Sequence, residues 1–293
     1  MRLSEYFDRA AVVRDGEFAQ LDEADARAPA SLVFCQQLDY LSRAASNPQV
    51  SCILTKPELL ADAKDKAVAL APDPRLAYFL LYRRLFAEGR LRPQMAFGVG
   101  SGVQVHPSAV VSKLCRIGNG VRIGPGAVIE DYSQIGEGAL IGPRVVIGAE
   151  GLLTLWDEKG APVIVPHAGG VSIGREAVIL AGSVVAKSLF GSPTEIGDFC
   201  QIGILTNIGH GARLGARCVV SGNCVVAGRV RIGERAWLGA SSSIAQGLHI
   251  GAGARVHAGS VVVQDVPPNE SVSGNFAMAH AAHVRGFLQG RRS

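Results

Sequence analysis

Aliphatic residues recur at every sixth position over most of the chain beyond its first hundred residues. Between Val99 and Val262 the sequence divides into 24 hexads, and each begins with Val, Ile or Leu. In 14 of the 24 hexads the second residue is Gly, as in IGNGVR, IGPGAV, IGEGAL and IGHGAR. A short period kept over so many units is typical of a solenoid built from stacked repeats.

The period predicts a parallel β-helix. Side chains six residues apart share one interior only if each hexad forms a short flat strand and a corner, so that three hexads close one coil. The 24 hexads then give about eight coils. The fifth hexad position is mostly small or β-branched and suits a cramped inward corner; four of the six cysteines fall there, namely Cys115, Cys200, Cys218 and Cys224. We interpret them as buried filler rather than catalytic thiols.

Three regions are expected along the chain. Residues 1–96 lack hexads and show β-rich runs (LVFC, VSCILT) and an amphipathic segment (PRLAYFLLYRRLFAEG), which predict a small α/β domain. Residues 97–266 form the β-helix, and residues 267–293 form a turn and a short helix from Phe276 to about Gln289. Insertions after Ile147 and Val185 interrupt the repeat and predict loops projecting from corners, the longer of which could cover a cleft.

Composition narrows the function classes. The chain has 36 Gly, 6% aromatic and 18% charged residues, and a formal charge of only +4. The arginines are spread without interleaved aromatics, which argues against a nucleic-acid surface. The opening MRLSEYFDRA has acidic residues where a signal peptide would need an apolar stretch, and no apolar run approaches the roughly 18 residues of a membrane span, so we expect a soluble, cytoplasmic protein with no integral membrane segment. No CxxC pair or zinc spacing occurs, and free thiols are expected.

The hexads resemble those of the left-handed β-helix acyltransferases, and the whole chain is most similar to the UDP-3-O-acylglucosamine N-acyltransferases of lipid A synthesis. The small α/β domain, the segment DPRLAYFLLYRRLF before the repeat and the mid-helix insertion beginning GAEG carry the similarity. The resemblance implies left-handed coils, a homotrimer with active sites between subunits, a nucleotide-sugar acceptor, and an acyl donor on the phosphopantetheine of acyl carrier protein or coenzyme A. No tightly bound cofactor and no metal are expected.

The resemblance also suggests a nucleotide site in the first domain. In FCQQLDY, Phe34 and Tyr40 share the spacing of the family's aromatic pair around the uracil ring, with Gln37 between them. Two rings can clamp a flat base by stacking. The alternative is that both rings belong to the core of a small domain.

His210, in the hexad IGHGAR, matches the catalytic histidine of this family. Attack of an amine or hydroxyl on a thioester needs a base of near-neutral pKa, and imidazole suits that task. A coil of 18 residues places Gly228 beside His210 on the next coil and Gln246 beyond it. We therefore expect the phosphopantetheine arm to pass Gly228, Gln246 and Gly247, with the Gly228 amide as oxyanion donor. The alternative is an exposed histidine with no catalytic role.

Some motifs depart from the lipid A family. Gly247, in IAQGLH, stands where the family has a second histidine, and the end GSVVVQDVPP resembles coenzyme A-dependent sugar acetyltransferases. An acetyl-CoA-dependent nucleotide-sugar acetyltransferase for surface polysaccharide, acting on an amine or a hydroxyl, therefore stays open. So does a non-enzymatic scaffold. A zinc carbonic anhydrase is disfavoured because the histidines His106, His210, His249 and His257 are not spaced by multiples of about 18 residues.

Overall fold

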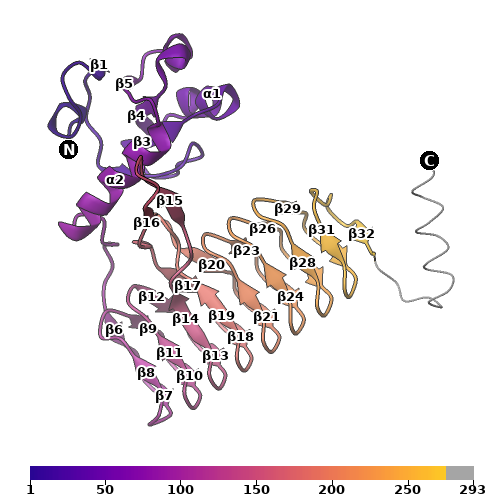
Figure 1. The fold of residues 1–293 in the computed structure, drawn as a ribbon. Helices are drawn as coiled ribbons and strands as arrows, with labels where there is room; N and C mark the ends of the chain where they lie inside the picture. Colours follow the sequence, from indigo (N-terminus) through magenta and orange to yellow (C-terminus); the bar gives the residue numbers. More distant parts are fainter. Residues whose placement is uncertain (275–293) are drawn as a thin grey trace, which may run out of the picture.

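The computed structural model describes residues 1–274, in which a small α/β domain precedes a long parallel β-helix (Figure 1). The first domain has a five-stranded sheet of order β1-β5-β4-β3-β2, in which only β1 runs antiparallel to its neighbour. Its elements are η1 (Leu3–Glu5), β1 (Val12–Arg14), β2 (Gln20–Leu21), β3 (Ser31–Cys35), α1 (Leu38–Ser46), β4 (Val50–Thr55), η2 (Pro57–Ala63), β5 (Ala67–Leu70) and α2 (Pro74–Ala87).

The apolar runs of the first domain form its central strands, as the sequence predicts. LVFC lies in β3 and VSCILT is β4, and both strands are largely buried between parallel neighbours. The predicted helix before the repeat is α2. Asp73 caps it by accepting a hydrogen bond from the Leu76 N–H at 3.0 Å, and Pro74 occupies its first turn, where no N–H is needed.

The β-helix has three faces, each a parallel sheet. The first face has nine strands: β7 (Gln104–Val105), β10 (Arg122–Ile123), β13 (Leu140–Ile141), β18 (Val178–Ile179), β21 (Gln201–Ile202), β24 (Val219–Val220), β27 (Trp237–Leu238), β30 (Arg255–Val256) and β32 (Ser271–Val272). The second has eight: β8 (Val110–Val111), β11 (Val128–Ile129), β14 (Val146–Ala149), β19 (Val184–Ala186), β22 (Asn207–Ile208), β25 (Val225–Val226), β28 (Ser243–Ile244) and β31 (Val261–Val262). The third also has eight: β6 (Gly98–Val99), β9 (Arg116–Ile117), β12 (Ser133–Ile135), β17 (Val171–Ile173), β20 (Thr194–Ile196), β23 (Arg213–Leu214), β26 (Arg231–Ile232) and β29 (His249–Ile250).

The hexad residues line the interior of this helix. Uninterrupted coils pair residues 18 apart, for example Ile208 with Val226 and Leu214 with Ile232, and all four side chains are buried. Fifth-position residues such as Cys218 and Ala212 are also buried. Burying one aliphatic side chain of this size contributes about 1.5–3 kcal/mol, so the repeat itself supplies the core.

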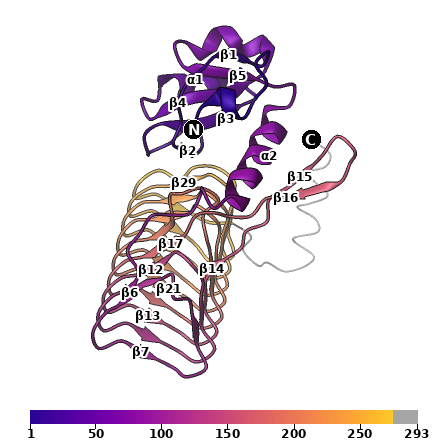
Figure 2. The same cartoon turned by 90° about the vertical axis from the view of Figure 1, so that its left-hand side faces the viewer.

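Both insertions pack against α2. The longer one forms the antiparallel hairpin of β15 (Thr154–Trp156) and β16 (Pro162–Ile164), which lies beside α2 in Figure 2. Its buried residues Leu155 and Val163, together with Phe190 of the shorter insertion, share one apolar cluster with Tyr78 and Tyr82 of α2. The Tyr82 hydroxyl donates to the Leu189 carbonyl and accepts from the Ala168 N–H at 2.8 Å. The insertions therefore join the first domain to the β-helix.

Three further expectations concern single features. All six cysteines are buried and free. No helix within residues 1–274 is long and apolar enough to cross a membrane. The predicted C-terminal helix from Phe276 lies outside the described residues.

Candidate active site

His210 occupies a corner of the β-helix between the second and third faces. It follows β22 and precedes β23, and the hexad residues on either side, Ile208 and Ala212, are fully buried. Gly209 permits the tight approach of the next coil, since a Cβ there would lie 2.5 Å from the Gly228 nitrogen. The corner thus directs the partly exposed imidazole outward while its neighbours hold the backbone in the stack.

Gly228 lies directly beside the imidazole on the next coil. A Cβ at Gly228 would lie 2.6 Å from Nε2 of His210, and the Arg229 N–H donates to the His210 carbonyl at 2.9 Å. On the following coil the Gly247 N–H donates to the Gly228 carbonyl at 3.0 Å, and Gln246 is exposed. The structure therefore stacks His210, Gly228 and the pair Gln246 and Gly247 on successive coils, as the coil length of 18 residues predicts. We call these residues the His210 column, and their catalytic and donor-binding roles stay predictions.

A second histidine, which the sequence reasoning did not single out for chemistry, lies against His210. The ring of His167, from the longer insertion, is 5.3 Å from that of His210 in an edge-to-face arrangement and is almost completely buried. Its backbone N–H donates to Glu150 at 3.0 Å, and its Nδ1 is 3.5 Å from the same carboxylate. Lys187 pairs with the other Glu150 oxygen at 2.7 Å. The backbone hydrogen bond holds His167 beside the candidate base, although neither ring nitrogen has a hydrogen-bond partner within residues 1–274.

The surroundings keep His210 neutral. Burial, aided by the neighbouring His167 and Arg229, lowers the pKa of His210 to about 4. Burial also lowers the pKa of His167, although Glu150 opposes this. This pKa is lower than the near-neutral value expected for the base from the sequence, but at neutral pH the His210 imidazole is unprotonated and has a lone pair available to accept a proton.

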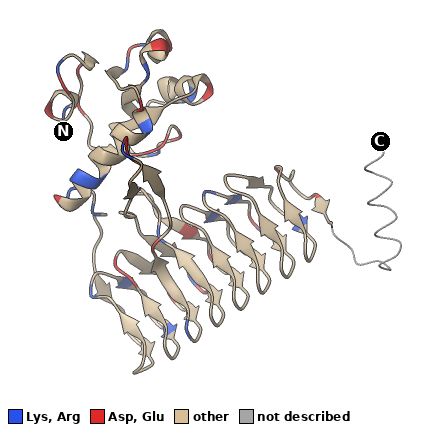
Figure 3. Cartoon of the chain, viewed as in Figure 1, with Lys and Arg blue, Asp and Glu red and all other residues tan. Residues whose placement is uncertain are grey.

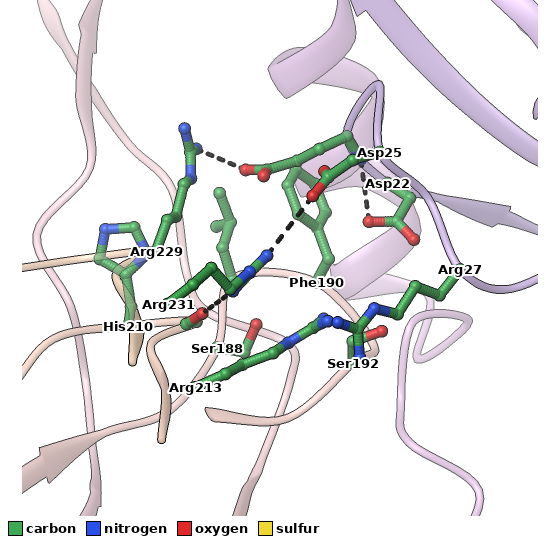
Figure 4. Close-up of a pocket in the computed structure, with 13 residues that line it drawn as sticks. Asp22, Asp25, Arg27, Ser188, Phe190, Ser192, His210, Arg213, Arg229 and Arg231 are labelled. Atoms are coloured by element: carbon green, nitrogen blue, oxygen red, sulfur yellow. Dashed lines mark hydrogen bonds and ion pairs between the residues drawn. The ribbon is translucent and has the colours of Figure 1, made fainter. Parts of the chain in front are cut away.

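The first domain closes one side of this site. The segment after β2 lies over β23 and β26, and with them lines a pocket next to His210 (Figure 4). Arg229 contacts Glu23 at 2.6 Å and Arg231 contacts Asp25 at 3.4 Å, so two ion pairs join the domains there. The remaining lining includes Asp22, Arg27, Ser188, Leu189, Phe190, Ser192, Gly211 and Arg213.

The predicted nucleotide residues do not line this pocket. Phe34 is partly buried at the end of β3, where its ring packs 5.0 Å from Tyr78 and 5.6 Å from Phe79. Tyr40 is half exposed on α1 with the Arg43 guanidinium 4.5 Å above its ring, and Gln37 is the exposed N-cap of that helix. Phe34 thus packs as a core residue of the first domain, which is the alternative stated above. The binding of a uracil ring by Phe34, Gln37 and Tyr40 stays a prediction.

The residues that sequence reasoning missed come from segments outside the repeat or from outward strand positions. His167 stands in an insertion, whose path no period describes. Arg213 and Arg231 immediately precede buried hexad starts, and the coil length of 18 residues could have placed them side by side on one face. Nothing in the sequence indicates that the segment containing Glu23 and Asp25 lies over them.

The repeat matches two family models. Residues 114–149 and 193–228 match the bacterial transferase hexapeptide (six repeats), and residues 160–187 and 229–264 match the hexapeptide repeat of succinyl-transferase. A comparison with curated proteins gives no significant match.

Solved structures with a similar fold include acyltransferases. The UDP-N-acetylglucosamine acyltransferase from Campylobacter jejuni is 22% identical, covering 62% of this chain and 77% of that one, with a TM-score of 0.47. That from Francisella novicida is also 22% identical, covering 60% and 67%, with a TM-score of 0.40. A mutant perosamine N-acetyltransferase from Caulobacter crescentus, in complex with CoA and GDP-perosamine, is 22% identical over 83% and 92%, with a TM-score of 0.28.

The matched repeats and the three parallel faces define the class of protein. The fold is a left-handed parallel β-helix, and the two matched models, of hexapeptide repeats of bacterial transferases and of succinyl-transferase, support an acyltransferase.

Proposed function

We propose that the protein transfers an acyl group from a phosphopantetheine thioester to the amine of a UDP-linked amino sugar, as in lipid A synthesis, with His210 as general base. The observation that carries this proposal is the neutral imidazole of His210 at a corner of the acyltransferase fold, in contact with Gly228 and beside a pocket that the first domain closes. Either acyl carrier protein or coenzyme A would present the thioester.

The reaction needs only the residues of the His210 column, which are His210, Gly228, Gln246 and Gly247. The amine nitrogen attacks the thioester carbonyl carbon while Nε2 of His210 takes its proton, which gives a tetrahedral intermediate with a negative oxygen. The C–S bond then breaks, and the departing thiolate takes the proton from the imidazolium. The products are an amide and a free thiol, with no acyl-enzyme intermediate.

Gly228 supports this reaction in two ways. It has no side chain, so the thioester end of a phosphopantetheine arm can approach Nε2 closely, past Gln246 and Gly247. No acceptor for the Gly228 N–H is found within residues 1–274, so this amide is free to donate to the developing oxyanion. In other enzymes the loss of one oxyanion-hole donor costs about 2.7–4 kcal/mol of transition-state stabilisation.

His167 and Glu150 are positioning residues in this scheme. The edge-to-face contact holds the His210 ring over Gly228, and the Glu150 carboxylate holds the segment that carries His167. Neither group needs to touch the substrate.

A second candidate has support at the donor end of the column. Gly247 stands where a second histidine is expected in the lipid A enzymes, and it has a positive φ of 77° and no side chain. An acetyl-CoA-dependent acetyltransferase of a nucleotide sugar would transfer only a short acyl group, and a corner without a side chain can accommodate that donor.

A substrate matrix tests both candidates. Purified protein is incubated with UDP- or dTDP-linked amino sugars and with acetyl-CoA or a long-chain acyl carrier protein, and amides are detected by mass spectrometry. Long-chain transfer to a UDP-amino sugar supports the main proposal. Acetyl transfer alone selects the second candidate, and no amide with any pair contradicts both.

A further inference from the structure

Four arginines gather around the pocket beside His210, although charged residues are sparse along the β-helix as a whole (Figure 3). Arg213 and Arg231 are register partners on adjacent strands, β23 and β26, and project from the same outer face. Adjacent strands are about 4.8 Å apart, so two like charges are held close together. Arg229 joins them from the preceding corner and Arg27 from the first domain.

The partners of these arginines are unequal. Arg229 and Arg231 contact Glu23 and Asp25, and Arg231 also donates to the Gly211 carbonyl at 2.9 Å. The Arg213 side chain is only 15% exposed, and its one carboxylate contact within residues 1–274, with Glu195 at 3.4 Å, is not aligned as a hydrogen bond. Its Nε and Nη1 atoms are buried without an acceptor in the described part of the chain. Buried guanidinium donors without acceptors are costly, and an anion in the pocket would satisfy them.

Two carboxylates fill the space in which such an anion would bind. The pocket has a free volume of only about 30 Å³, and Glu23 and Asp25 are part of its lining. Guanidinium groups pair bidentately with phosphates as they do with carboxylates, and two of them on adjacent strands can each bind one phosphoryl group. A ligand with two linked phosphates could therefore replace both carboxylates.

We propose that Arg213, Arg231, Arg229 and Arg27 bind the diphosphate group of a substrate, and that Glu23 and Asp25 occupy this site until the diphosphate displaces them. The inference rests on the proposed function, because a diphosphate is present both in nucleotide-linked sugars and in coenzyme A. The carboxylates then compete with the ligand, which distinguishes this site from a purely structural domain contact.

Calorimetric titrations of the full-length protein with pyrophosphate, UDP and coenzyme A, at one fixed ionic strength, test the proposal. Arg213→Gln should weaken binding about tenfold to a hundredfold, the usual effect of losing a charged hydrogen bond. Glu23→Gln should tighten binding several-fold because a competing carboxylate is lost. Arg116→Gln, at an exposed position on the same face but outside the pocket, is the matched control and should change nothing.

The ligands separate the two sources of diphosphate. Arg213-dependent loss for UDP but not coenzyme A identifies the nucleotide sugar, and the reverse identifies the donor; uridine and pantetheine, which lack the diphosphate, should not respond. If Arg213→Gln does not fold, Arg213→Lys keeps the charge without the fork and should give a smaller loss. Unchanged binding in the Arg213 variants, or weaker binding in Glu23→Gln, overturns the proposal. Binding is measured without turnover, so this failure is distinct from a failure of acyl transfer in the unaltered protein.

Discussion

The imidazole of His210 lies against Gly228 so closely that a single methyl group at Gly228 would be 2.6 Å from Nε2. The contact joins two adjacent coils and determines where the candidate base points.

Gly228→Ala should displace the His210 ring and lower kcat by about tenfold to a hundredfold. The added Cβ overlaps Nε2, and the ring must rotate away from the attacking amine. The fold should persist, because the overlapped atoms belong to a side chain at the surface of the stack. Steady-state kinetics measure the effect. Gly191→Ala, where a Cβ meets nothing within 4 Å, is the control, and equal activity of the two variants would contradict the assignment.

His167→Gln should raise the pKa of His210. His167 lowers that pKa through its charge, so its removal leaves only burial and Arg229 acting in that direction. The Cε1 proton of His210, followed by NMR during a pH titration, should have its midpoint near pH 4 in the unaltered protein and at higher pH in the variant. A midpoint that moves down or stays fixed would show that the two rings do not interact electrostatically.

Asp22→Asn should stabilise the protein at pH 7. Burial raises the pKa of Asp22 from its ordinary 3.8 to about 6. Ionised Asp22 therefore destabilises the folded state, increasingly between pH 3.8 and 6 and fully above pH 6. The destabilisation is about 2–3 kcal/mol at pH 7 and falls to about 0.5 kcal/mol at pH 4, because near the ordinary pKa of 3.8 the unfolded state also becomes protonated. Asparagine keeps the acceptor for the Glu23 N–H. Urea unfolding at these two pH values measures it, and a gain that persists at the lower pH would contradict this origin.

Tyr82→Phe should lower the unfolding free energy by about 1–2 kcal/mol. The change removes the hydroxyl that links the Leu189 carbonyl to the Ala168 N–H, between the two insertions. Because the longer insertion carries His167, activity should also fall, whereas Tyr40→Phe, at an exposed position, should leave stability unchanged. Thermal unfolding of the two variants makes the comparison, and equal stability would show that the bridge contributes nothing.

The sequence predicts those parts of the fold that its period determines. Every coil repeats the same six-residue rule, so Ile208, Val226 and the placement of Gly228 beside His210 follow from counting. The contact of His167 with His210 does not, because an insertion leaves the repeat and its path depends on packing against α2. The position of Glu23 and Asp25 over Arg229 and Arg231 likewise depends on how two domains dock, which no local pattern encodes.

Single-turnover acyl transfer by His210→Asn tests the central claim most directly. Asparagine retains a polar side chain of similar reach but cannot accept the proton, so the rate of amide formation should fall by about 10²–10⁴ while donor affinity stays within a few-fold. His106→Asn, at an exposed histidine of a distant coil, should react like the unaltered protein. An amide-forming rate in His210→Asn equal to that of the His106 control would contradict the assignment of His210 as the base.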